Sequence, residues 1–194
     1  MLKLFGRGPE ILFEALHRCP KKMWFYCPAD GRWSIHEIIL HLTDNEAEAY
    51  VHCRQFIAEP GSIASTLDAP RWATMLGYFH QSTGDALGLI LRLRRMTYKI
   101  LQYIPDPVWQ HTVKDPHRGM MTLDEWLGVQ AQHIPHHVEQ IRLNYVEWRK
   151  QGIRQNHVKW KKQRSRPHQR RHKASHSTVA SKEIDIDSVQ NAVF

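Results

Sequence analysis

The sequence feature that most constrains the fold is the apolar pattern of residues 34–60. Ser34, followed three residues later by Glu37, forms the S-x-x-E capping box that starts many helices. Pro60 and Gly61 provide the stop. Between them, apolar residues recur at about 100° per residue and share one stripe: Ile35, Ile38, Ile39, Leu42, Ala49, Cys53 and Phe56. This pattern predicts a long amphipathic helix.

Three further segments carry helical patterns. We expect helices over residues 9–19, about 72–103, and from Thr122 to about Gln151, the last opened by a second capping box with Glu125. The expected core side of the third is Trp72, Met75, Leu76, Phe79, Leu87, Ile90, Leu93 and Ile100. No segment shows a convincing strand pattern or an internal repeat. The sequence therefore predicts an all-α, up-down-type four-helix bundle over residues 1–152.

The positive charge is confined to the end of the chain. From Lys150 onward there are 11 Lys and Arg against 3 Asp and Glu, while residues 1–149 hold 16 of each sign. Low hydrophobicity and high charge predict a disordered basic tail over residues 153–194. The segment around Trp160 could bind nucleic acid or another anionic partner through phosphate contacts, or it could be a solvated extension without a partner.

Other sequence features exclude several protein classes. No apolar run approaches the roughly 18 residues of a membrane span, and the start of the chain lacks a secretory signal, so we expect a cytoplasmic protein and no membrane partner. The three cysteines, Cys19, Cys27 and Cys53, show no C-x-x-C spacing. They indicate neither a disulfide framework nor a zinc ribbon.

Polar residues occupy unexpected positions on two of the predicted helices. On a helical wheel, the inward face of the last helix contains Gln130, His133, His137 and Asn144. His41 lies at the margin of the stripe in the 34–60 helix, while His36 points away from it and is expected to be solvated. Buried polar groups need partners, which could be a hydrogen-bond network, water or a metal ion. His41 with the i, i+4 pair could supply three imidazole ligands, or the histidines could be ordinary core or surface residues.

The residues carrying this pattern resemble a known family. The segments "GRWSIHEIILHLTDNEA" and "RGMMTLDEWLGVQAQHIPHHVEQI", and the helices between them, are similar to the DinB/YfiT-like superfamily over roughly residues 8–150. The resemblance implies a four-helix bundle, often dimeric, with one divalent metal ion held by His41, His133 and His137. Imidazole ligands favour Zn or Ni, with Fe, Mn or Cu as alternatives.

The resemblance also implies a metal-dependent enzyme acting on a small molecule. Some relatives are S-transferases that use low-molecular-weight thiols, and others are regarded as hydrolases. The competing hypothesis is a non-catalytic helical dimer or scaffold whose basic tail binds an anionic partner. The residues expected to support the histidines are Glu46, Gln130, Gln140 and Asn144; no catalytic base is evident. Pro135, which is disfavoured inside a helix, lies between His133 and His137 and predicts a local kink there. His136 is expected to face away from the metal ion.

Overall fold

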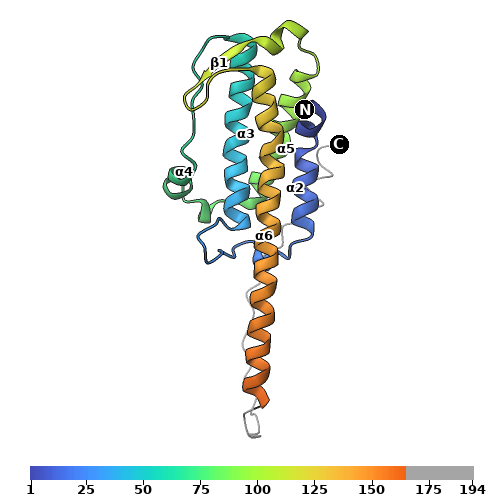
Figure 1. Cartoon of the computed structure of the whole chain (residues 1–194), viewed down its shortest axis with the longest axis vertical. Coiled ribbons are helices and arrows are strands. Elements are labelled where there is room, and N and C mark those ends of the chain that lie inside the picture. The colour runs from blue at the N-terminus through green and yellow to red at the C-terminus, as the bar shows by residue number, and fades with distance from the viewer. Residues whose placement is uncertain (165–194) are drawn as a thin grey trace.

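Four helices lying side by side form the body of the protein, whose structure is a computed structural model (Figure 1). They are α2 (Gly8–His17), α3 (Ile35–Ala58), α5 (Thr83–Leu101) and α6 (Leu123–Arg164). α3 packs against α5 and α6, and α2 packs against α6. The structure describes the backbone of residues 1–164 and the side chains of residues 1–152. The predicted helical bundle is confirmed.

The capping box predicted for α3 is formed. The Ser34 hydroxyl accepts the Glu37 N–H at 3.2 Å, and the Glu37 carboxylate accepts the Ser34 N–H at 2.8 Å. These bonds satisfy two of the N–H groups that a helix start leaves without partners. The cap fixes where α3 begins, and therefore which of its residues face the bundle.

The third predicted helix is wrong in its first half. The chain forms α4 (Ala69–Met75) and the 3-10 turn η2 (Tyr78–His80) before α5 begins. Gly77 adopts φ +58°, a left-handed conformation that ends a helix and that glycine tolerates best. Met75 and Phe79, expected in the core, are 74% and 71% exposed. Trp72 and Leu76 are exposed as well.

A short hairpin replaces part of the long loop expected before α6. β1 (Thr112–Asp115) pairs antiparallel with β2 (Gly119–Thr122), with Thr112 opposite Thr122. At the turn, the Asp115 carboxylate accepts the backbone N–H groups of His117 and Arg118, both at 2.8 Å. The 3-10 turn η3 (Asp106–Gln110) precedes the hairpin. Strands of four residues are too short to show a clear alternating pattern.

The N-terminus adds a helix that the sequence did not predict. α1 (Leu2–Gly6) inserts Phe5, which is fully buried, beside α5 and α6. A Cβ on Gly6 would lie 2.7 Å from the Tyr98 ring, so this close approach requires glycine. The 3-10 turn η1 (Lys21–Met23) follows α2.

His36 is not solvated, contrary to the expectation from its wheel position. It is 1% exposed, and its Nδ1 and Nε2 atoms lie 2.8 Å from the Thr83 hydroxyl and the Tyr78 carbonyl oxygen. The turn that precedes α5 folds over the start of α3 and buries this ring. His36 therefore helps to anchor η2.

The apolar core has two parts, and α3 and α6 pass through both. One part packs the first half of α3 against α2 and α5, and includes Ile134 and Ile141 of α6. The other packs Phe5, Phe56 and Trp126 at the opposite end. His133 and His137 thus lie on α6 near the place where the two parts meet. Polar side chains at this junction interrupt an otherwise apolar interior.

α6 runs past Gln151, where we expected it to end, to Arg164 (Figure 1). Of the predicted tail, residues 165–194 lie outside the described residues, as do the side chains of 153–164. Among the described helices, none combines the length and apolar character needed to cross a membrane.

Candidate metal centre

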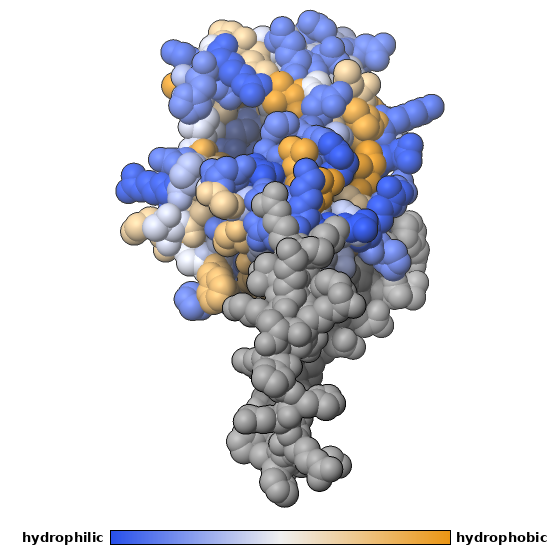
Figure 2. All heavy atoms as spheres, turned by 60° about the horizontal axis from the view of Figure 1, so that its bottom comes forward, coloured by the Kyte–Doolittle hydropathy of each residue, from blue (hydrophilic) through white to orange (hydrophobic). Residues whose placement is uncertain are grey.

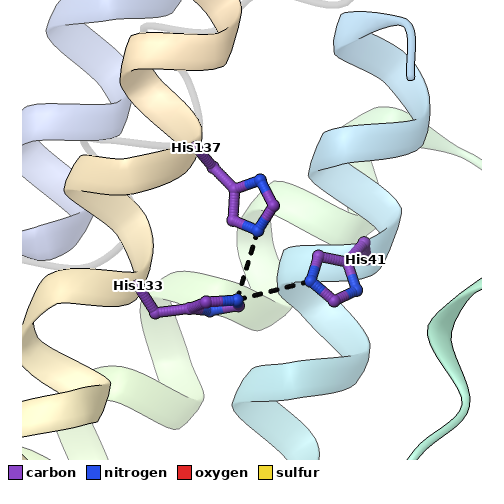
Figure 3. A group of neighbouring side chains, drawn as sticks. All are labelled: His41, His133 and His137. Atoms are coloured by element: carbon purple, nitrogen blue, oxygen red, sulfur yellow. Dashed lines mark hydrogen bonds between the residues drawn. The ribbon is translucent and has the colours of Figure 1, made fainter. Parts of the chain in front are cut away.

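Three histidine side chains from two helices converge between α3 and α6 (Figure 3). The Nε2 atom of His133 lies 3.3 Å from that of His41 and 3.2 Å from that of His137. One ring nitrogen of each residue lies within 4.8 Å of the others. The structure therefore brings together the three residues that the sequence singled out.

This spacing fits a shared metal ion. Two nitrogen ligands about 2.05 Å from one zinc ion, at a tetrahedral angle, are about 3.3 Å apart. Hydrogen bonds alone explain the cluster less well. A neutral imidazole carries one N–H, and the His133 Nε2 atom could direct a proton at only one of its two neighbours. A cation can accept lone pairs from all three nitrogens at once.

Burial keeps the three rings neutral. Loss of water contact, reinforced by the repulsion that a protonated His137 would exert, lowers the pKa of His41 to about 4. Burial is also the main cause that lowers the pKa of His137 to about 4 and that of His133 to about 2. At pH 7 the imidazoles are therefore unprotonated, which is the state that binds metal.

Gln140 holds the ring of His137. Its Oε1 atom lies 2.9 Å from the His137 Nδ1 atom, and its Nε2 atom lies 3.0 Å from the His136 Nε2 atom. An amide oxygen only accepts, so the His137 proton sits on Nδ1 and the Nε2 lone pair faces the cluster. His136 is exposed, in agreement with its expected outward position.

Glu46 and Asn144, two of the four residues expected to support the histidines, make other contacts. Glu46 forms a buried ion pair with Arg94 of α5, with one contact at 2.9 Å. Asn144 is fully buried and donates to the Trp33 carbonyl oxygen at 2.8 Å, while its own oxygen accepts from Arg32 at 3.0 Å. Their wheel positions pointed inward correctly, but the wheel could not show which neighbour lay opposite.

Gln130, the fourth expected supporting residue, is 9% exposed. Its side-chain oxygen has no hydrogen-bond partner in the described part of the chain. Its backbone carbonyl oxygen accepts from Arg94 at 3.4 Å. The Gln130 side chain is thus buried one turn from His133, and its oxygen accepts no hydrogen bond from the described residues.

Pro135 does not separate the paired histidines. α6 continues as one helix through this residue, and the His133 and His137 Nε2 atoms stay 3.2 Å apart. Pro135 lacks a backbone N–H, but the side chains of His133 and His137 on either side of it still reach the same point. The local change expected from proline is therefore compatible with the cluster.

A pocket of about 250 Å³ opens beside the cluster. It is lined by His137 and Gln140 of α6 and by Gly31, Arg32 and Trp33 of the connection before α3. The Trp33 ring lies 4.9 Å from the His41 ring. The missed signal was the position of Trp33 just before the α3 cap. The His41 side chain leans toward the N-terminus of its helix, and therefore toward Trp33.

Arg32 ties this pocket wall to α6. Its guanidinium donates to Asp30 at 2.7 Å, to Asn144 at 3.0 Å and to Glu147 at 2.6 Å. Tyr26 also donates to Glu147, at 3.0 Å. At the end of the bundle from which α6 emerges, the coloured part of the surface mixes polar and apolar residues (Figure 2). The wall is therefore held by hydrogen bonds and ion pairs to α6.

Sequence comparison relates this chain to the DinB superfamily and to proteins named putative metal-dependent hydrolases. A sequence model of the DinB superfamily matches residues 4–141. A protein of Oceanobacillus iheyensis named "putative metal-dependent hydrolase" is 26% identical over 111 residues, covering 57% of this chain and 64% of that protein. The similarly named YfiT of Bacillus subtilis is 21% identical over 113 residues, covering 58% and 64%. The matched region thus spans less than two thirds of these relatives.

Solved structures share the fold. The structure of YfiT from Bacillus subtilis, described as a probable metal-dependent hydrolase with an unusual four-helix bundle topology, matches with a TM-score of 0.70 at 18% identity, covering 76% of this chain and 85% of YfiT. A mycothiol-dependent maleylpyruvate isomerase matches with a TM-score of 0.60 at 11% identity, covering 72% and 58%. At these identities the likeness concerns the fold alone.

Proposed function

This chain belongs to the DinB superfamily, and we propose that it is a metal-dependent enzyme that hydrolyses a small molecule. The observation that carries the proposal is the convergence of three Nε2 atoms at 3.2 and 3.3 Å, the spacing of ligands around a tetrahedral ion. His41, His133 and His137 would hold one divalent ion, with zinc or nickel the best match to imidazole ligands. The names of the hydrolase-like relatives agree with this assignment.

Three protein ligands leave coordination positions open, as in catalytic rather than structural zinc sites. A divalent ion bound there supplies Lewis-acid activation and lowers the pKa of a bound water toward about 7. The chain's own residues would prepare this chemistry. The buried histidines stay neutral, Gln140 orients His137, and the pocket beside His137 admits the substrate between the Trp33 ring and α6.

Thiol transfer is the alternative reaction at the same centre. The family resemblance implies it, and a thiol could enter through the same pocket. In both reactions the metal site is the same, and the nucleophile differs. We assign no described side chain as a general base. The residues around the centre therefore do not distinguish hydrolysis from thiol transfer, and an experiment is needed to separate them.

The test is a turnover assay of zinc-loaded protein on a panel of small esters, amides and electrophiles, with and without a low-molecular-weight thiol. We expect activity that disappears in metal-free protein and in His137→Ala. The exposed neighbour variant, His136→Ala, should keep its activity. Turnover without thiol identifies hydrolysis, and an absolute requirement for thiol identifies transfer. Equal turnover in His137→Ala and wild type would refute a role for this centre.

As a second function, we propose that the basic end of α6 binds nucleic acid. Between Glu147 and Arg164 the sequence contains no acidic residue, and Lys150, Arg154 and Lys161 recur at helical spacing. α6 continues beyond the bundle in this region (Figure 1). A basic helix of this kind can neutralise phosphates of nucleic acid without reading its sequence.

Homodimer formation and a cytoplasmic location also remain proposals. Both follow from the family resemblance and the sequence composition. Sedimentation equilibrium at several protein concentrations tests the dimer, and fractionation of cells expressing the tagged chain tests the location.

A further inference from the structure

Two of the three clustered histidines have a second ring nitrogen without a partner. The Nδ1 atoms of His41 and His133 are buried and make no hydrogen bond within the described residues. Two buried amide oxygens are in the same condition: Oδ1 of Asn45 and Oε1 of Gln130. An unpaired buried polar atom loses the free energy of its contacts with water, so four such atoms on two clustered histidines and on two amides within one turn of them call for an explanation.

The helix geometry places each amide next to one histidine. Asn45 follows His41 by four residues on α3, and Gln130 precedes His133 by three on α6. Residues three or four apart share a helix face, and side chains lean toward the N-terminus. Asn45 therefore leans over the turn of His41, and His133 leans over the turn of Gln130.

The third histidine shows the completed arrangement. Gln140 follows His137 by three residues, and its oxygen lies 2.9 Å from the His137 Nδ1 atom. An amide side chain one turn away on the same helix thus already holds one imidazole of the cluster, although Gln140 and Asn45 follow their histidines whereas Gln130 precedes His133. Histidines that bind metal almost always donate their second N–H to a carboxylate, a carbonyl oxygen or water.

We propose that Asn45 and Gln130 are positioning residues whose amide oxygens accept the Nδ1 protons of His41 and His133 when the centre holds its metal ion. Each of the three imidazoles is then held by an amide on its own helix. This arrangement fixes the tautomer that presents all three Nε2 lone pairs to the ion. The inference rests on the proposed metal site.

The test compares the zinc dissociation constants of full-length variants, measured by competition with a chelating dye. Asn45→Ala and Gln130→Ala should each weaken zinc binding by about 10- to 100-fold. Asn45→Asp, which keeps an acceptor oxygen, should bind zinc at least as tightly as wild type. Gln55→Ala is the matched control, because Gln55 also has an unpaired buried oxygen on α3 but lies about 15 Å beyond Asn45 along the helix.

Nitrogen-15 NMR of the histidines in zinc-loaded wild type gives a second readout that needs no variant. We expect protons on the Nδ1 atoms of His41 and His133, both shifted downfield and slow to exchange. Zinc binding in Asn45→Ala and Gln130→Ala within twofold of wild type, or Nδ1 protons that exchange rapidly in wild type, would overturn the inference. If wild type binds no zinc, the proposed metal site itself fails, and this inference fails with it.

Discussion

Burial of the three clustered histidines makes the stability of the metal-free protein depend on pH. In the unfolded chain histidine titrates near pH 6.5, whereas the folded protein holds the pKa of His41 and His137 at about 4. As the pH falls below 6.5, the unfolded chain takes up protons first. The free energy of unfolding should therefore decrease between about pH 6.5 and 4, by about 3 kcal/mol for one such histidine.

Urea unfolding of metal-free protein at several pH values measures this effect. His137→Gln should reduce the slope of unfolding free energy against pH in that window. His136→Gln removes an exposed neighbour and should leave the slope as in wild type. Identical slopes in the two variants would show that burial of the cluster does not set the pH dependence.

The ion pair between Glu46 and Arg94 is the most deeply buried charge contact described, since both side chains are 1% exposed. The guanidinium also lies 3.9 Å from the Phe5 ring and donates to the Phe5 carbonyl oxygen at 3.3 Å. Arg94→Met leaves the Glu46 carboxylate unpaired and should lower the unfolding free energy by about 3–5 kcal/mol.

The double variant Glu46→Leu with Arg94→Met removes both charges and serves as the control. It should recover most of the lost stability in the same urea titration, because no buried charge is left unpaired. A double variant as unstable as the single one would mean that the pair contributes through packing and not through charge.

At the scale of elements, helix caps were the most reliable sequence signals. Ser34 and Glu37 located the start of α3, and Thr122 and Glu125 located that of α6, because a capping box depends on contacts within one turn. The segment around Gly77 was mispredicted because its apolar residues follow helical spacing while its glycine turns the chain. Periodicity does not show which apolar residues stay exposed.

The candidate site also contains residues that the sequence predicted and residues that it missed. The three histidines were found from spacing on two helices and from the family resemblance. The pocket wall at Arg32 and Trp33 was missed, because an irregular connection has no periodicity that reports its neighbours. Asn45 was passed over because a wheel gives its direction but not its missing partner.

The basic end of α6 gives a prediction at this scale. If it binds single- or double-stranded nucleic acid through about four phosphate contacts, affinity should fall about 100-fold between 50 and 200 mM salt. Fluorescence anisotropy with a labelled oligonucleotide measures this. A chain truncated after Gly152 should lose the binding, and equal affinity of the two chains would assign the contact elsewhere.

At the scale of the whole molecule, metal binding and folding are linked. His41 belongs to α3, and His133 and His137 belong to α6, so an ion at the cluster joins two helices of the bundle. A ligand that binds only the folded state, at 100 times its dissociation constant, adds about 2.7 kcal/mol of stability. For a chain of this size that raises the melting temperature by about 5–10 °C.

Differential scanning calorimetry with and without zinc checks this linkage. His137→Ala should melt at nearly the same temperature in both conditions. Because the chain contains other histidines, an equal zinc-induced rise in wild type and in His137→Ala would assign the stabilisation to a different site.

The most direct test of the central claim is the metal content of the purified full-length protein, measured by elemental analysis after removal of loosely bound ions. We predict about one divalent ion per chain in wild type and almost none in folded His41→Ala, His133→Ala and His137→Ala, with His136→Ala retaining the wild-type content. Negligible metal in wild type, or equal metal in wild type and in the three ligand variants, would contradict the claim that these imidazoles share one ion.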